Sequence, residues 1–144
     1  MEGRICCICG DKNITDKNTL KEIYDIMSAL VQYGGVTTFY SEHLTDFDII
    51  CEMMVLSLKK RFRHLKLCVV MHYVTAMHPP KLPPYFDKLI VPKIMDEKSL
   101  KAIKYFIVNR SDCMIAYVED KKSDVYKMLR YARKIGMFVC QCNI

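Results

Sequence analysis

Hydrophobic positions change their spacing several times along this chain, from strand-like runs to helical intervals and back. Residues 36–40 form a β-branched and aromatic run directly after the breaker pair Gly34-Gly35. Residues 65–71 form a second apolar run, which predicts a buried strand. Between the two runs, one apolar stripe recurs at intervals of three and four: Phe47, Ile50, Met54, Leu58 and Phe62. Strand, helix and strand within about 35 residues predict a parallel βαβ unit.

The same alternation continues over the rest of the chain. Further strands are expected at residues 4–9, 88–91, 113–118 and 137–142. Further helices are expected from about residue 20 to Gly34, from Asp96 to 108, and from Ser123 to Gly136. The pattern predicts an α/β, Rossmann-like, doubly wound fold with a mainly parallel sheet of about six strands and helices on both faces. Its length of 144 residues suits a single domain, residues 1–144.

Composition narrows the class of protein without identifying a function. The chain is 51% hydrophobic and 26% charged, which is ordinary for a folded soluble domain. Its first residues lack the apolar segment of a secretory signal, so we expect a cytoplasmic protein without a membrane. The net charge of +6 is dispersed, and its densest run, residues 59–64, closes a predicted helix. Nucleic acid is therefore not expected as a partner.

The eight cysteines fall mostly within apolar, strand-like runs. Cys6 and Cys9 have the C-x-x-C spacing, but residues three apart in a strand point to opposite faces. We therefore expect the cysteines to act as small core residues. His43, His72 and His78 have no metal-binding spacing either. No metal and no cofactor are predicted.

Candidate ligand residues follow three of the predicted strands, because parallel sheets bind ligands outside the carboxyl ends of their strands. They are Gly10, Asp11 and Lys12 after the first strand; Ser41, Glu42, His43, Asp46 and Asp48 after the second; and Glu119, Lys121, Ser123 and Asp124 after the fifth. The carboxylates can bind hydroxyls or a base amine, while Ser41 and main-chain amides hold a phosphate. Alternatively, Asp46 caps a helix, Asp48 supports its first turn, and Glu42 and His43 are solvated.

Three motifs carry a resemblance to a known family. They are Cys6-Cys7-Ile8-Cys9-Gly10, residues 35–41 followed by Phe47-Asp48, and residues 111–117 with 130–134. In order and spacing the chain resembles the SLOG superfamily (Smf/DprA and LOG proteins), in particular the YpsA-like branch. The resemblance implies a Rossmann-like fold and a nucleotide-derived ligand.

The chain departs from this family where glycines normally approach a phosphate. Glu42, His43 and Asp46 replace the glycines of the second loop, and Ser123-Asp124 replaces those that open the last helix. Side chains at these positions block a close approach of backbone amides to a phosphate. The resemblance therefore implies a remodelled pocket or none.

Three functions remain open. The first is non-catalytic binding of a nucleotide-derived small molecule by a homo-oligomer, as a sensor or as a sponge that sequesters a signalling nucleotide in anti-phage defence. The second is a nucleotide N-glycosidase that uses Glu42, although the P-G-G-x-G-T-x-x-E signature of LOG enzymes is absent. The third is a degenerate interaction module with a closed pocket, whose partner surface is the proline-rich segment 79–84.

Overall fold

Six parallel strands form one sheet in the order β4-β3-β2-β1-β5-β6. The structure is a computed structural model that describes residues 3–11, 16–71, 81–92 and 101–142. The strands are β1 (Arg4–Gly10), β2 (Val36–Ser41), β3 (Lys66–Val70), β4 (Lys88–Ile90), β5 (Cys113–Tyr117) and β6 (Phe138–Gln141). The described helices are α1 (Lys17–Gln32), α2 (Asp46–Lys59), α4 (Lys101–Arg110) and α5 (Asp124–Lys134).

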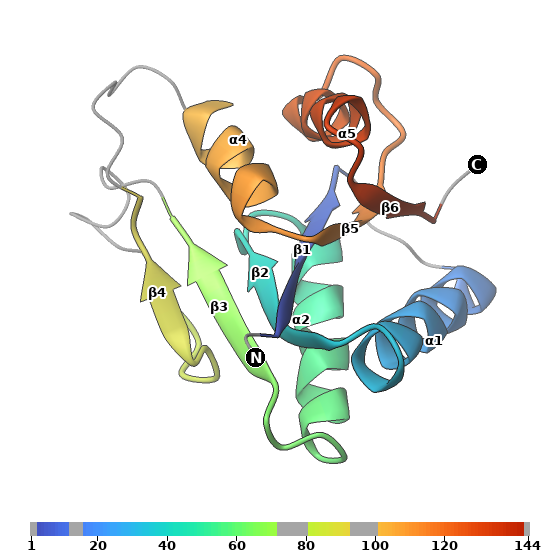
Figure 1. Ribbon diagram of the computed structural model, residues 1–144, viewed down its shortest axis with the longest axis vertical. Coiled ribbons are helices and arrows are strands. Elements are labelled where there is room, and N and C mark those ends of the chain that lie inside the picture. Colours follow the sequence, from blue (N-terminus) through green and yellow to red (C-terminus); the bar gives the residue numbers. More distant parts are fainter. Residues whose placement is uncertain (1–2, 12–15, 72–80, 93–100, 143–144) are drawn as a thin grey trace.

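The helices cover both faces of the sheet, α1 and α2 on one side and α4 and α5 on the other (Figure 1). Successive side chains of β1 point to opposite faces of the sheet, so this strand contributes to both halves of the core. Cys6 and Ile8 pack with α1 and α2, whereas Cys7 and Cys9 pack with α4 and α5. The predicted fold class is confirmed: the sheet is parallel, six-stranded and Rossmann-like.

Six of the eight cysteines are buried in this core, and none of the eight forms a disulfide. Cys6 and Cys9 lie on opposite faces of the sheet, as their spacing along a strand predicts. Burial raises the pKa of both thiols, so they behave as apolar side chains rather than as thiolates.

Several predicted boundaries need correction. β4 ends at Ile90 rather than residue 91, and β5 ends at Tyr117 rather than residue 118. Asp96, the predicted cap of the helix before β5, lies outside the described residues, as do His72, His78, Pro79 and Pro80.

The buried face of α2 differs from the predicted stripe. Ile50 and Met54 are only partly buried, and Phe62 lies beyond the helix. The residues that are buried are Phe47, Asp48, Cys51, Glu52, Val55 and Leu58. The sequence contains two apolar stripes with equally good helical spacing, and packing against the sheet selects the one that also carries two acidic residues.

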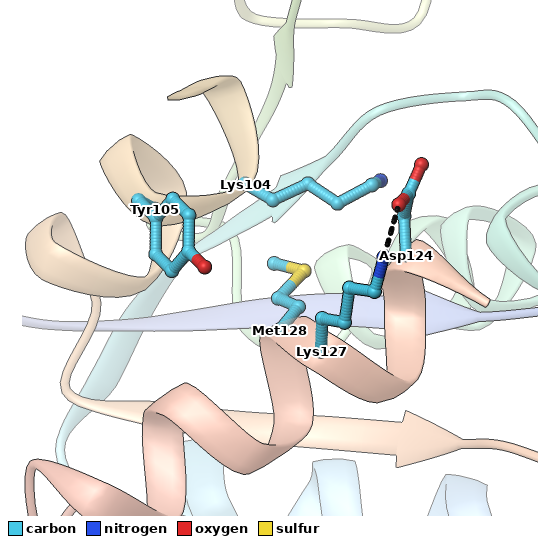
Figure 2. A pocket seen from close by; sticks show the side chains of 5 residues that line it. All are labelled: Lys104, Tyr105, Asp124, Lys127 and Met128. Carbon is cyan, nitrogen blue, oxygen red and sulfur yellow. Dashed lines mark ion pairs between the residues drawn. The ribbon is translucent and has the colours of Figure 1, made fainter. Parts of the chain in front are cut away.

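Helices α4 and α5 pack against each other, and a small cavity lies between them (Figure 2). Its volume is about 10 Å³, which is room for a single water molecule. The lining residues are Lys104, Tyr105, Asp124, Lys127 and Met128. In the part of the chain that the structure describes, no helix is long and apolar enough to cross a membrane.

Gly10 ends β1 directly beneath the ring of Phe47. A Cβ atom at residue 10 would lie 2.3 Å from Phe47 Cγ and Cδ1. The ring is fully buried and stacks on Tyr117 at a centroid distance of 6.0 Å. Because Gly10 has no side chain, the ring of Phe47 can occupy the space beside it.

Gly10→Ala is expected to lower the free energy of unfolding by about 1–3 kcal/mol, because the new methyl group overpacks the core against Phe47. Urea unfolding measures the change. Phe47→Leu in the Gly10→Ala background should recover part of the loss, since leucine leaves space for the methyl group. Equal stability of Gly10→Ala and the wild type would contradict this account of the contact.

Candidate functional site

Asp11 joins the loop after β1 to the loop after β5. Its carboxylate accepts hydrogen bonds from the backbone N–H groups of Glu119 (3.0 and 3.1 Å) and Asp120 (2.8 Å). The hydroxyl of Ser123, the residue that caps α5, lies 3.3 Å from the same carboxylate and donates at a shorter distance, 2.7 Å, to the carbonyl oxygen of Asp120. We call this set of four residues the Asp11 latch.

The Asp11 latch lies where Rossmann-like folds reverse their strand order. The chain winds from β1 toward β4 on one side and places β5 and β6 on the other, so the reversal lies between β1 and β5. Backbone amides at such a point, next to a helix N-terminus, normally attract an anion. Here the carboxylate of Asp11 takes the place of that anion. The predicted residues Asp11, Glu119 and Ser123 do come together, but they bind one another.

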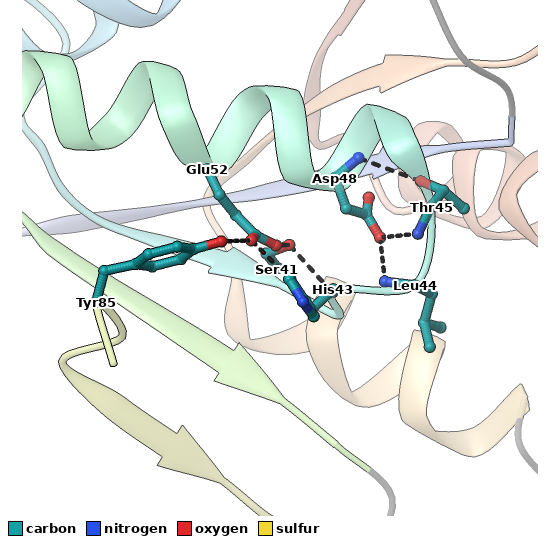
Figure 3. A network of polar contacts seen from close by, with 7 residues as sticks. All are labelled: Ser41, His43, Leu44, Thr45, Asp48, Glu52 and Tyr85. Carbon is teal, nitrogen blue, oxygen red and sulfur yellow. Dashed lines mark hydrogen bonds and ion pairs between the residues drawn. The ribbon is translucent and has the colours of Figure 1, made fainter. Parts of the chain in front are cut away.

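A second cluster lies at the end of β2 and is centred on Glu52, whose side chain is fully buried (Figure 3). Ser41 Oγ donates a hydrogen bond to Glu52 Oε2 at 2.7 Å. Tyr85 donates its hydroxyl hydrogen to Oε1 at 2.7 Å, and His43 Nδ1 lies 2.7 Å from the same oxygen. We call these four residues the Glu52 cluster. The donors balance the desolvation of a carboxylate that would otherwise be costly to bury.

His43 is held in an unusual backbone conformation within this cluster. Its φ of 57° is the only positive value at a non-glycine position in the described chain. Its backbone N–H donates to Ser41 Oγ at 3.3 Å, and its ring contacts Phe86 edge-on at a centroid distance of 5.5 Å. Strain of this kind persists only where the surroundings hold it, and it concentrates at functional sites.

The imidazole of His43 is oriented by Glu52 and remains 19% exposed. Because Nδ1 contacts the carboxylate, Nε2 is the nitrogen that points away from Glu52, and no described residue forms a hydrogen bond with it. A carboxylate that fixes one ring nitrogen and leaves the other free is a recurrent way to position a histidine for a ligand.

Asp48 completes a capping box at the start of α2. Its Oδ2 accepts from the N–H groups of Leu44 (3.0 Å) and Thr45 (3.3 Å), while Thr45 Oγ1 accepts from the N–H of Asp48 (3.2 Å). Thr45, and not the predicted Asp46, is the N-cap. Burial raises the pKa of Asp48 to about 7, and the carboxylates of Glu42 and Glu52 add to that effect.

Glu42 forms an ion pair with Lys104 of α4 at 2.9 Å. The two side chains are 12% and 15% exposed, so neither is the solvated surface group that one interpretation of the sequence expected for Glu42. Burial alone would lower the pKa of Lys104, but the Glu42 carboxylate more than offsets this and raises it.

The remaining predicted residues do not join these clusters. Asp46 and Lys121 are exposed, and Asp124 is exposed beside Lys127 at 3.9 Å. Lys12 lies outside the described residues. The ring of Phe47 covers Gly10 from the α2 side.

The residues of the site that were missed from the sequence include Glu52, Tyr85 and Lys104. One signal was available for Glu52, which stands four positions after Asp48 and so shares its helix face. Two carboxylates at that spacing repel each other in solvent, and their presence in an apolar segment indicates local partners. In the described residues there is no group of three or more His, Cys, Asp or Glu side chains that could hold a metal ion.

Two solved structures share this fold. One is the molybdenum cofactor binding protein of the phototrophic bacterium Rippkaea orientalis, with a TM-score of 0.62 and 16% identity over 98% of this chain and 77% of that chain. The other is the molybdenum cofactor carrier protein of Chlamydomonas reinhardtii, with a TM-score of 0.62 and 12% identity over 97% of this chain and 76% of that chain.

At these identities the likeness establishes a common Rossmann-like fold, and it is consistent with the SLOG-type fold that the motifs predict. No protein-family model matches the sequence, and no curated protein matches it either.

Asp48→Asn is expected to flatten the pH dependence of stability. The folded-state pKa of about 7 lies above the unfolded value of about 3.9, so the folded protein binds the extra proton between these pH values. The contribution of Asp48 to the free energy of unfolding should therefore fall as pH rises from about 4 to about 7, and this contribution is what Asp48→Asn removes. Asparagine keeps an oxygen acceptor for the two amides and has no proton to lose.

Urea unfolding of both proteins across this pH window measures the difference between their slopes. Asp46→Asn, at an exposed position in the same helical turn, is the matched control and should keep the wild-type slope. Parallel curves for the wild type and Asp48→Asn would contradict the raised pKa of Asp48.

Asp11→Ala is expected to lower stability by about 1 kcal/mol, because two backbone amides lose their acceptor. Inorganic phosphate should then raise the Tm of Asp11→Ala and leave that of the wild type unchanged, since the vacated amides can bind an anion. Asp25→Ala, at an exposed position of α1, is the control. An equal effect of phosphate on all three proteins would argue against the latch as an occupied anion site.

Proposed function

We propose that this chain binds a nucleotide-derived small molecule at the carboxyl edge of its sheet, without chemistry, and that His43 is the central contact. The observation that carries the proposal is the geometry of His43: a left-handed backbone and an imidazole fixed at 2.7 Å by a fully buried carboxylate. A solvated surface histidine needs neither feature. Both orient Nε2 before a ligand arrives, which reduces the entropic cost of binding.

The charges around His43 favour the nucleoside part of a ligand over its phosphate. The carboxylates of Glu42 and Glu52 lie close enough to Asp48 to raise its pKa, and Lys104 is already paired with Glu42. The anion position between β1 and β5 is taken by Asp11. Ribose hydroxyls and base amino groups donate hydrogen bonds to carboxylates, each worth about 1.5–3 kcal/mol.

Several features favour binding over catalysis. Glu42, the candidate for N-glycosidic cleavage, is held in the ion pair with Lys104. Ser41 donates its hydroxyl hydrogen to Glu52 rather than to His43, so this serine and histidine are not arranged as a nucleophile and its base. The two proteins of the same fold are named as a cofactor binding protein and a cofactor carrier, which also supports non-catalytic binding.

More specifically, we propose that the protein is a sensor, or a sponge that sequesters a signalling nucleotide during phage–bacterium conflict. In this form of the proposal, the chain is a SLOG-type protein of the YpsA-like branch, and it acts in the cytoplasm as a homo-oligomer. This form is supported by the motifs quoted above and by the absence of the LOG-type enzyme signature from the sequence.

Calorimetry against a panel of cyclic and linear nucleotides tests the proposal. We expect one of them to bind, and His43→Gln to weaken its binding about tenfold or more, since glutamine cannot reproduce the oriented Nε2. His64→Gln, at an exposed position after α2, is the matched control and should bind as the wild type does.

Two outcomes would overturn the proposal. If the wild type binds nothing on the panel, the binding function fails and the interaction module becomes the better explanation. If the nucleotide is consumed and Glu42→Ala stops its turnover, the chain is an N-glycosidase.

A further inference from the structure

An open groove runs along α4 and α5, away from the Glu52 cluster. Its volume is about 600 Å³, and it adjoins the small cavity of Figure 2, with which it shares Tyr105 and Lys127. The lining residues are Tyr105, Lys127, Arg130, Tyr131, Arg133 and Lys134. Four of the six are cations and none is acidic. We call this surface the α4–α5 groove.

The cations of the α4–α5 groove are poorly neutralised by the protein itself. Lys127, Arg130 and Lys134 lie three, four and seven residues apart, so they form one stripe along α5. Lys127 lies 3.9 Å from Asp124, in a pair whose two side chains are about half exposed. Arg130 and Lys134 have no ion-pair partner among the described residues.

The dipole of α5 accounts for part of this positive charge. Arg133 and Lys134 lie in the last turn of α5, where cations complement the helix dipole. Lys127 and Arg130 lie before that turn, where the dipole offers them nothing. Lys127 has its helical pair with Asp124, whereas Arg130 has no ion-pair partner among the described residues. An anionic partner in the groove would supply the missing counter-charge.

The two tyrosines indicate which kind of anion fits. Tyr105 and Tyr131 meet edge-to-face, with centroids 4.7 Å apart and an interplanar angle of 87°. The two rings are therefore almost perpendicular, and the hydroxyl of Tyr131 is fixed to Asn109 at 2.7 Å. Successive bases of single-stranded nucleic acid stack on ring faces that lie roughly parallel, which this pair does not offer. A peptide needs an apolar contact and cations for its carboxylates, which this groove supplies.

We propose that the α4–α5 groove docks an acidic peptide segment of a partner protein. The aspartates and glutamates of the segment pair with Lys127, Arg130 and Lys134, and an apolar side chain packs against Tyr105, which is 41% exposed. The inference is independent of the nucleotide site, because no residue of the Glu52 cluster lines the groove.

Fluorescence polarisation with a labelled peptide of alternating glutamate and leucine tests the proposal. We expect binding at low salt that weakens as salt is raised, because the contacts are ion pairs. The double variant Arg130→Glu/Lys134→Glu should weaken binding at least tenfold. Arg130→Gln/Lys134→Gln, which adds no acid at the helix terminus, should weaken it about threefold to tenfold, and circular dichroism checks that both variants fold.

The matched control is Lys60→Glu/Arg63→Glu, at exposed positions beyond the end of α2. It changes the net charge by the same amount and should leave peptide binding unchanged. An equal loss in the control would show that net charge alone attracts the peptide and would overturn the proposal. Tighter binding of a labelled oligothymidine, lost in Tyr105→Ala, would assign the groove to nucleic acid instead. Failure of the wild type to bind the peptide at low salt would also overturn it.

Discussion

The burial of one carboxylate, that of Glu52, determines how the edge of this sheet is built. An ionised group without contact with water is stable only if its oxygens are fully hydrogen-bonded. The donors come from three places: Ser41 at the end of β2, His43 in the following loop, and Tyr85 before β4. These contacts with Glu52 link the β2 loop to the segment before β4, and His43 makes its contact from a left-handed backbone.

Two more carboxylates accept hydrogen bonds from backbone amides that would otherwise be available to an anion. Asp11 accepts from the amides after β5, and Asp48 accepts from the amides that precede α2. Backbone amides that already have acceptors gain little from an external anion. The amides of these loops are thus already satisfied within the chain, which fits the proposal that a ligand is recognised through side chains such as His43 rather than through the backbone.

The charged side chains on the surface of α4 and α5 are less completely paired within the chain. At the carboxyl edge the side chains of Asp11, Asp48 and Glu52 accept hydrogen bonds and Glu42 is paired with Lys104, whereas Arg130 and Lys134 have no ion-pair partner among the described residues. The proposed ligand site and the proposed docking groove therefore lie on different surfaces and differ in how far their charges are paired within the chain.

The fold follows from the sequence to a large extent, because alternation and helical spacing are local properties. They placed all six strands and the helices on both faces to within a few residues. They could not select the buried stripe of α2, since two stripes of equal spacing compete until the helix meets the sheet. The rule that parallel sheets bind ligands at the carboxyl ends of their strands also placed Ser41, His43 and Asp11 at this edge. It did not identify the residues that these three contact. Glu52 and Tyr85 are 33 residues apart, and Asp11 and Ser123 are 112 apart. Contacts over such separations leave no periodic trace in a sequence, so only the tertiary structure decided which polar residues are buried and which nitrogen of His43 is presented outward.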